Sequence, residues 1–191
     1  MNWCHDILNQ SSPQTKLHLD IHPWEIRKSN EYFLQWILRK NSFTLFFDGT
    51  SKGNPGEASA GGIIFDPGGN LVMPYAWGIG HRTNNEAEWL ALLLGLDPIR
   101  QNNISNLIVF GDSKQVIQKM RTGYNRCAAK FRIIYDRIHH LSTNPHVSFF
   151  HILRGNNIEA DKLANQGVRN EMVLVTIKGY KKKLQTCPLV S

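Results

Sequence analysis

The sequence predicts an α/β fold in which helices cover both faces of a mixed sheet. Three β-prone runs separated by turn residues come first, and helices and strands alternate after them, an order typical of such a sheet. The chain has 191 residues, of which 41% are hydrophobic and 19% charged. This composition is globular, and the length suits one domain of about 130–150 residues with flanks. We place that domain at residues 42–170.

The first half of the domain is predicted to be an antiparallel meander of three strands. Their apolar runs cover residues 43–47, 58–65 and 71–79. Turn-forming residues fill 48–56 between the first two runs, and Asp-Pro-Gly-Gly-Asn at 66–70 forms the hairpin between the last two. Sequential strands joined by short turns therefore build one half of the sheet.

The second half alternates helices and strands. Thr83, with Glu86 three residues later, is a capping box, so a helix begins there, and Pro98 predicts that it ends near Leu96. After it we expect a strand over 107–111, helices over 113–120 and 130–141, a strand over 146–153, and a final helix over 156–168 opened by a second capping pair, Asn156 with Glu159.

The two ends of the chain lie outside this domain. Residues 1–41 form an N-terminal flank with no motif that we can interpret, although Ser29 is placed to cap a short helix that ends near Arg39. Residues 171–191 are predicted to be a basic C-terminal tail with one strand over 172–177.

The chain is basic, with a formal net charge of +7 and an isoelectric point near 9.5. A basic protein favours a polyanionic partner, most simply nucleic acid, but charge alone is equally compatible with no nucleic-acid role. The three cysteines are widely spaced and form no CxxC pair, which predicts a reducing intracellular compartment, either nucleus or cytoplasm. We see no secretory signal and no apolar run long enough to span a bilayer, so no membrane partner is expected.

Four acidic residues occupy positions where an α/β sheet places its ligands. Asp48 and Asp112 each follow an apolar β run, Glu88 lies in the first turns of a helix, and Asp161 lies early in the last helix. Converging carboxylates repel one another unless a cation binds between them, and Mg²⁺ prefers oxygen ligands. Because any one such acid is more often a turn or cap residue, the prediction of a metal site depends on the whole set.

Four sequence blocks contain these acids. They are Asp-Gly-Thr-Ser-Lys-Gly-Asn-Pro-Gly at 48–56, Thr-Asn-Asn-Glu-Ala-Glu at 83–88, Gly-Asp-Ser at 111–113 and Asn-Ile-Glu-Ala-Asp-Lys-Leu-Ala at 157–164. Taken in this order, they resemble type 1 ribonuclease H over about residues 43–168, in the version found in plant retroelements. The resemblance implies a five-stranded mixed sheet with helices on both faces. It also implies an endonuclease that hydrolyses the RNA strand of RNA/DNA hybrids.

The resemblance further implies catalysis with two Mg²⁺ ions, or with Mn²⁺ in their place. By the matching motifs, Asp48 bridges both ions, and Asp161 helps to hold the ion that activates the attacking water. Glu88 and Asp112 hold the ion at the leaving 3′ oxygen. The products would carry 5′-phosphate and 3′-hydroxyl ends.

Small, polar and amide residues near these acids are the candidate contacts to the hybrid. Amides can bond to ribose 2′-hydroxyls, which distinguish RNA from DNA, and a helix N-terminus suits a phosphate. The candidates are Gly53, Asn54, Thr83, Asn84, Asn85, Ser113, Arg154 and Asn157.

Two features depart from many bacterial members of the family. The loop before the last helix lacks their His, so either turnover is slower or product release uses Arg154, and we interpret His151, inside a predicted strand, as structural. The basic handle is also missing, because residues 121–130 are short and only mildly basic.

Two other functions remain open for such a chain. One is a non-catalytic nucleic-acid-binding module of retroelement origin, although the complete set of acids argues against a decayed site. The other is a nuclease that cuts a different duplex, as integrases and resolvases do, although the Gly-Asn-Pro-Gly loop and the Thr-Asn-Asn block favour the hybrid. We expect the protein to be a monomer.

Overall fold

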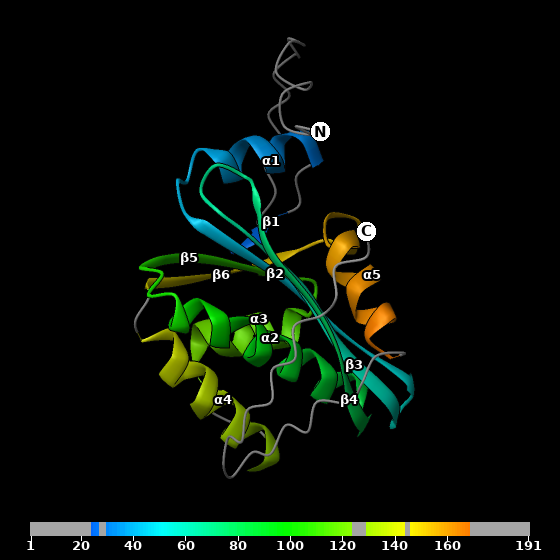
Figure 1. The fold of residues 1–191 in the computed structure, drawn as a ribbon. Helices are drawn as coiled ribbons and strands as arrows, with labels where there is room; N and C mark the ends of the chain where they lie inside the picture. The colour runs from blue at the N-terminus through cyan, green and yellow to red at the C-terminus, as the bar shows by residue number, and fades with distance from the viewer. Residues whose placement is uncertain (1–23, 27–29, 124–128, 144–145, 169–191) are drawn as a thin grey trace.

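A six-stranded mixed sheet forms the centre of the computed structural model, with the strand order β1-β6-β5-β2-β3-β4 (Figure 1). The structure describes residues 24–26, 30–123, 129–143 and 146–168; the three cysteines, Ser29 and the strand expected over 172–177 lie outside them. The strands are β1 (Glu25–Ile26), β2 (Phe43–Gly53), β3 (Gly56–Phe65), β4 (Leu71–Arg82), β5 (Asn106–Gly111) and β6 (His146–Ile152). The helices are α1 (Asn30–Leu38), α2 (Asn84–Gln101), α3 (Lys114–Thr122), α4 (Ala129–Ser142) and α5 (Ile158–Gly167), with a 3₁₀ turn at Arg154–Asn156.

The topology of the sheet confirms the predicted fold class. β2, β3 and β4 form the antiparallel meander, while β5 runs parallel to both β2 and β6. The expected number of five strands is wrong by one, because β1 adds a sixth strand parallel to β6. A strand of two residues is too short to show an alternating pattern, so periodicity could not have found it.

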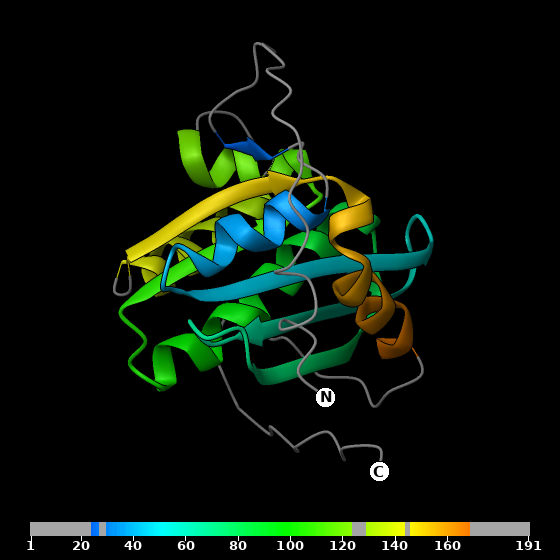
Figure 2. The same cartoon turned by 90° about the horizontal axis from the view of Figure 1, so that it is seen from above.

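Helices cover both faces of the sheet (Figure 2). On one face α2, α3 and α4 pack over the larger apolar core, which includes Leu45 and Trp89. On the other face lie α5 and α1, and α1 covers a smaller apolar cluster that includes Phe33 and Phe110. The helix expected in the N-terminal flank is thus present as α1 and packs on the same sheet. Among the described residues, none of the helices is long and apolar enough to cross a membrane.

Strand β2 is longer than the sequence indicates. It continues through the predicted turn as far as Gly53 and stays paired with β3, so Asp48 lies in the middle of the strand opposite Gly61 and not at its end. Only Asn54 and Pro55 remain in the turn. Gly53, the residue before them, has a φ of 95°, a value that favours glycine.

Helix α2 also extends past its predicted end. Pro98 lies inside the helix, which reaches Gln101. Proline removes one backbone donor, but Leu96 and Ile99 are both 1% exposed in the core, and their burial offsets the loss. The predicted capping box is confirmed, with reciprocal bonds between Thr83 and Glu86.

Candidate active site

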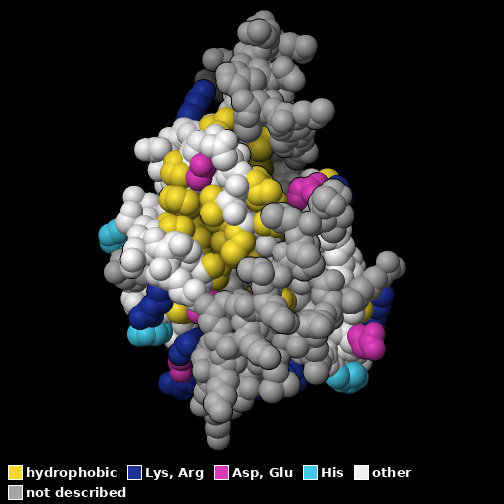
Figure 3. Space-filling view, in the orientation of Figure 1, with side chains coloured by type: hydrophobic (Ala, Val, Ile, Leu, Met, Phe, Trp, Pro, Cys, Tyr) yellow, Lys and Arg dark blue, Asp and Glu magenta, His cyan; other side chains and the backbone are white. Residues whose placement is uncertain are grey.

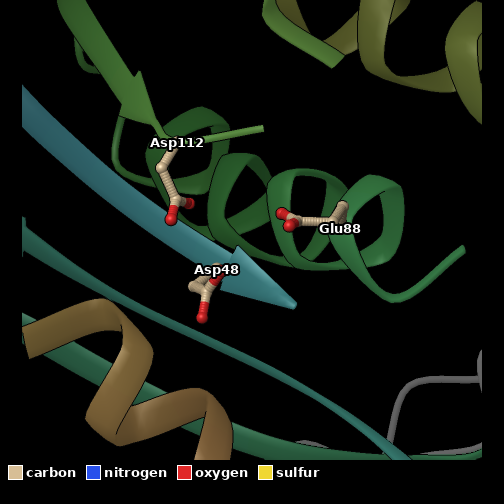
Figure 4. A group of neighbouring side chains, drawn as sticks. All are labelled: Asp48, Glu88 and Asp112. Atoms are coloured by element: carbon tan, nitrogen blue, oxygen red, sulfur yellow. The ribbon is translucent and has the colours of Figure 1, made fainter. Parts of the chain in front are cut away.

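Three of the four predicted acids meet at one point beside β2. Carboxylate oxygens of Asp48, Glu88 and Asp112 lie within 4.8 Å of one another (Figure 4). We call these residues the three-acid cluster. They come from the middle of β2, from the second turn of α2 and from the residue after β5, so elements distant in the sequence converge there.

Gly49 allows α2 to approach β2 closely enough for Glu88 to join the cluster. A Cβ atom at this position would collide with the backbone of Ala87 and Glu88, so no other residue fits without a shift. The backbone N–H of Gly49 also lowers the pKa values of Asp48 and Glu88, but burial outweighs this effect at both carboxylates.

The charges in the cluster are held in an unfavourable environment. Burial, and then repulsion by Asp112 and Asp161, raise the pKa of Asp48 from 3.8 to about 7. Burial, and then repulsion by Asp48 and Asp112, raise the pKa of Glu88 well above its ordinary value. In the described part of the chain, the buried Oε2 atom of Glu88 has no hydrogen-bond partner. A divalent cation would neutralise these charges and give that oxygen a ligand bond, so the residues fit a hard metal ion.

The fourth acid, Asp161, lies next to the cluster and forms an ion pair. It is in the first turn of α5, and its Oδ1 atom accepts a hydrogen bond of 2.6 Å from Nη2 of Arg154. The negative charge of Asp161 interacts electrostatically with the cluster, because it contributes to the raised pKa of Asp48. The Arg154 side chain is 78% exposed. A surface pair of this kind opens at small cost. The role of Asp161 as a metal ligand beside the three-acid cluster stays a prediction.

The side chain of Asn157 hydrogen-bonds to the side chain of Asp112. It is 1% exposed, and its Nδ2 atom donates to Oδ1 of Asp112 at 3.1 Å and to the carbonyl oxygen of Phe47 at 3.0 Å. Its amide therefore bridges Asp112 and Phe47, the residue that precedes Asp48 in β2. We expected a substrate contact at this position, whereas the structure turns the side chain inward to two parts of the site.

The other predicted contact residues lie mainly around the start of α2. The exposed Asn54, in the β2–β3 turn, accepts a bond from the backbone N–H of Asn84 at 3.1 Å, which ties this turn to the helix N-terminus. Thr83 caps the helix, Asn85 is half-buried, and Gly53 is exposed beside them. Ser113 precedes α3, where it makes no capping bond through its side chain. Their contact with a substrate stays a prediction.

Basic side chains near the site are largely engaged with the protein. Lys130 pairs with Glu86 at 3.3 Å, Arg121 donates to the carbonyl oxygen of Phe149 at 2.8 Å, and Lys114 forms an ion pair with a residue of β1. On the face drawn in Figure 3, hydrophobic side chains gather beside α1, and the Lys and Arg side chains are scattered. On the described residues of that face, the positive charge forms no continuous strip.

The part of the chain that carries these acids is similar in sequence to a known protein family. Residues 46–167 match the model of the family described as reverse transcriptase-like. Ribonuclease HI of Halobacterium salinarum is 34% identical over 125 residues, a match that covers 64% of this chain and 62% of that protein. A bifunctional protein of Mycobacterium tuberculosis is 29% identical, and only 34% of its length is spanned.

Two solved structures share the fold over nearly their whole length. RNase H1 from Halobacterium salinarum superposes with a TM-score of 0.64 at 30% identity, covering 67% of this chain and 98% of that one. LC11-RNase H1, solved in complex with an RNA/DNA hybrid, superposes with a TM-score of 0.62 at 28% identity, covering 67% of this chain and 97% of that one. About a third of the residues of this chain therefore have no counterpart in either structure.

Proposed function

Because the chain belongs to the type 1 ribonuclease H family, we propose that it is an endonuclease that hydrolyses the RNA strand of RNA/DNA hybrids. The observation that carries this proposal is the convergence of Asp48, Glu88 and Asp112, whose oxygens lie within 4.8 Å of one another with Asp161 beside them. The hybrid bound in one related structure supports the same substrate class. The retroelement-like version expected from the sequence agrees with the reverse transcriptase-like description of the matched family.

The carboxylates would hold two divalent ions, Mg²⁺ or Mn²⁺, with Asp48 between them. Bound ions of this kind lower the pKa of a water nucleophile and stabilise the leaving oxygen in phosphodiester hydrolysis. Glu88 and Asp112 would hold one ion, and Asp161 would contribute to the other. Burial of the Glu88 Oε2 atom supports its role as a ligand, since this oxygen otherwise lacks a partner among the described residues.

Arg154 would exchange its partner when substrate arrives. In the structure its guanidinium bonds to Asp161, and its positive charge also lowers the pKa values of Asp48 and Glu88. An exposed guanidinium next to a phosphodiester site is suited to bind phosphate oxygens in a bidentate manner. We infer that Arg154 contacts the backbone of the cut strand and leaves Asp161 free to bind metal.

The amides at the start of α2 would recognise the hybrid. Asn54 and Asn84 are both exposed. The backbone N–H of Asn84 donates to the Asn54 side chain, which limits the entropy that this side chain loses on binding. Amide groups can donate to and accept from ribose 2′-hydroxyls in a wide minor groove. Next to Thr83, the N-terminus of α2 would attract a phosphate of the DNA strand through its helix dipole.

A cleavage assay on matched substrates tests this function. The wild-type protein would be incubated with end-labelled RNA/DNA hybrid, RNA duplex or DNA duplex, in Mg²⁺ or in EDTA. We expect cleavage of only the RNA strand of the hybrid, only with Mg²⁺, to fragments with 5′-phosphate and 3′-hydroxyl ends. Asp48→Asn should abolish cleavage and keep hybrid binding. Asp136→Asn, an exposed change of the same charge on α4, should cleave normally.

The outcomes separate the alternatives. Tight hybrid binding without cleavage in Mg²⁺ or Mn²⁺ would indicate a non-catalytic binding module. Equal cutting of the DNA duplex would indicate a nuclease with another substrate. Binding should weaken as salt concentration rises, because contacts to phosphates release counterions.

A further inference from the structure

Strand β1 lies against the part of the molecule that carries Asp112, although it precedes the matched family region at 46–167. Glu25 pairs in register with His151 of β6. The backbone N–H of His151 donates to the carbonyl oxygen of Trp24 at 2.9 Å, and the two rings meet edge to face with centroids 6.5 Å apart. The half-buried ring of His151 thus packs against the ring of Trp24, the residue before β1.

The loop from Asp112 to Lys114 is held at both of its ends by this arrangement. Nε2 of His151 donates to the carbonyl oxygen of Asp112 at 3.1 Å. Two residues later, the ammonium of Lys114 forms an ion pair with the carboxylate of Glu25 and lies 5.8 Å from the ring centroid of Trp24. The Glu25 side chain is 3% exposed, so this pair is better shielded from water than an ordinary surface pair.

Asp112 needs such restraint because its neighbours repel it. Its carboxylate must stay near those of Asp48 and Glu88 before any cation arrives, and like charges at this separation favour movement apart. Asn157 hydrogen-bonds to the side chain of Asp112. The backbone of the same loop is restrained instead by the His151 bond to the Asp112 carbonyl oxygen and by the ion pair of Lys114. His151 in turn contacts Trp24, and Lys114 pairs with Glu25 of β1.

We propose that Trp24 and Glu25 are positioning residues of the active site: through His151 and Lys114 they fix the backbone of the Asp112 loop, so that its carboxylate can bind metal together with Asp48 and Glu88. The proposal rests on the proposed function for its catalytic consequence. Trp24 and β1 are then parts of the catalytic unit that lie outside the matched family region at 46–167. Its effect reaches the metal ligand only through the two intermediate residues.

The substitution Glu25→Gln tests the proposal, because it removes the charge and keeps the shape. In metal-free protein, amide hydrogens of residues 113–117 should exchange faster than in the wild type. Calorimetric titration should show Mn²⁺ binding that is weaker by roughly tenfold, as is usual when a residue supporting a metal ligand is lost. With hybrid, kcat at limiting Mg²⁺ should fall by a similar factor, whereas KM for the hybrid should stay within about twofold.

Two further variants make the result decisive. Asp136→Asn removes the same charge from the exposed Arg132–Asp136 pair on α4 and should leave exchange, Mn²⁺ affinity and turnover unchanged. Lys114→Met breaks the Glu25 ion pair from its exposed side, and it replaces Glu25→Gln in the exchange and Mn²⁺ measurements if that variant does not fold. Because Lys114 could also touch the hybrid, its decisive readouts are exchange and Mn²⁺ binding without substrate.

Unchanged exchange at 113–117 and unchanged Mn²⁺ affinity in the folded variant would overturn the proposal. A rise confined to KM would overturn it as well, since that result would make the segment a substrate contact. A wild-type protein that binds Mn²⁺ but cuts no hybrid would refute the proposed function alone. The exchange and Mn²⁺ data would then still decide whether β1 positions Asp112.

Discussion

Replacing Asp48 with Asn is expected to stabilise the metal-free protein. Burial and neighbouring carboxylates raise the pKa of Asp48 from 3.8 to about 7. The same side chain ionises near 3.8 in the unfolded chain, so above pH 7 folding must keep a carboxylate charged where the charge is disfavoured. At about 1.4 kcal/mol for each pKa unit, this costs the folded state about 4 kcal/mol.

The sign of the shift determines the pH dependence. Because the pKa is raised on folding, the folded state is favoured most below pH 3.8, and this advantage is lost as pH rises to about 7. At pH 8 the full cost of about 4 kcal/mol applies. At pH 5 Asp48 keeps its proton in the folded protein, and the cost is about 1.5 kcal/mol. Asn does not ionise, so the advantage of Asp48→Asn should shrink between pH 8 and pH 5.

Urea unfolding in EDTA measures this difference at the two pH values. Asp136→Asn serves as the control, because it removes an exposed carboxylate and should change stability by less than about 0.5 kcal/mol. Added Mg²⁺ should stabilise the wild type more than Asp48→Asn, since it binds the folded acids. An Asp48→Asn protein that is no more stable than the wild type in EDTA at pH 8 would refute the electrostatic reasoning.

Three further predictions concern packing and positioning around the site. Asn157→Leu should lower kcat by roughly tenfold with little change in KM, because Asp112 loses the amide that bonds to it. Steady-state kinetics on hybrid would instead show a raised KM with unchanged kcat if Asn157 touched substrate. Gly49→Ala should cost about 3 kcal/mol or more in urea unfolding, since its Cβ meets the backbone of α2, and a loss below about 1 kcal/mol would mean that α2 moves freely. Tyr75→Phe should cost about 1 kcal/mol, because the buried hydroxyl donates to the carbonyl oxygen of Ala91 at 2.8 Å; unchanged thermal unfolding would argue against that bond.

Local patterns predicted most of the fold because they act over short distances. The capping box at Thr83 and the apolar runs of the first three strands depend on neighbouring residues, and the structure confirms both the box and the meander. Pro98 was misleading, since the burial of Leu96 and Ile99 outweighs its local effect. Tertiary packing of this kind is not visible in a window of sequence.

In the candidate site, too, the sequence predicts which acids belong to it but not the contacts between residues from distant parts of the chain. The acids could be selected because Asp48 and Asp112 follow apolar runs, but the sequence does not indicate that Asp161 bonds to Arg154. It also gives no sign that Asn157 is buried between two strands. These contacts depend on how loops from separate elements meet. The contacts that Trp24 and Glu25 make with His151 and Lys114 were missed for the same reason, because they join residues that are far apart in the sequence.

Asp48, Glu88 and Asp112 are expected to bind divalent metal together. Anomalous diffraction from crystals soaked in Mn²⁺ would show this binding, because it locates the ion without relying on activity. We expect strong peaks between these three carboxylates and towards Asp161, and their loss in Asp48→Asn crystals. Saturating Mn²⁺ that leaves this position empty in the wild-type protein would contradict the account.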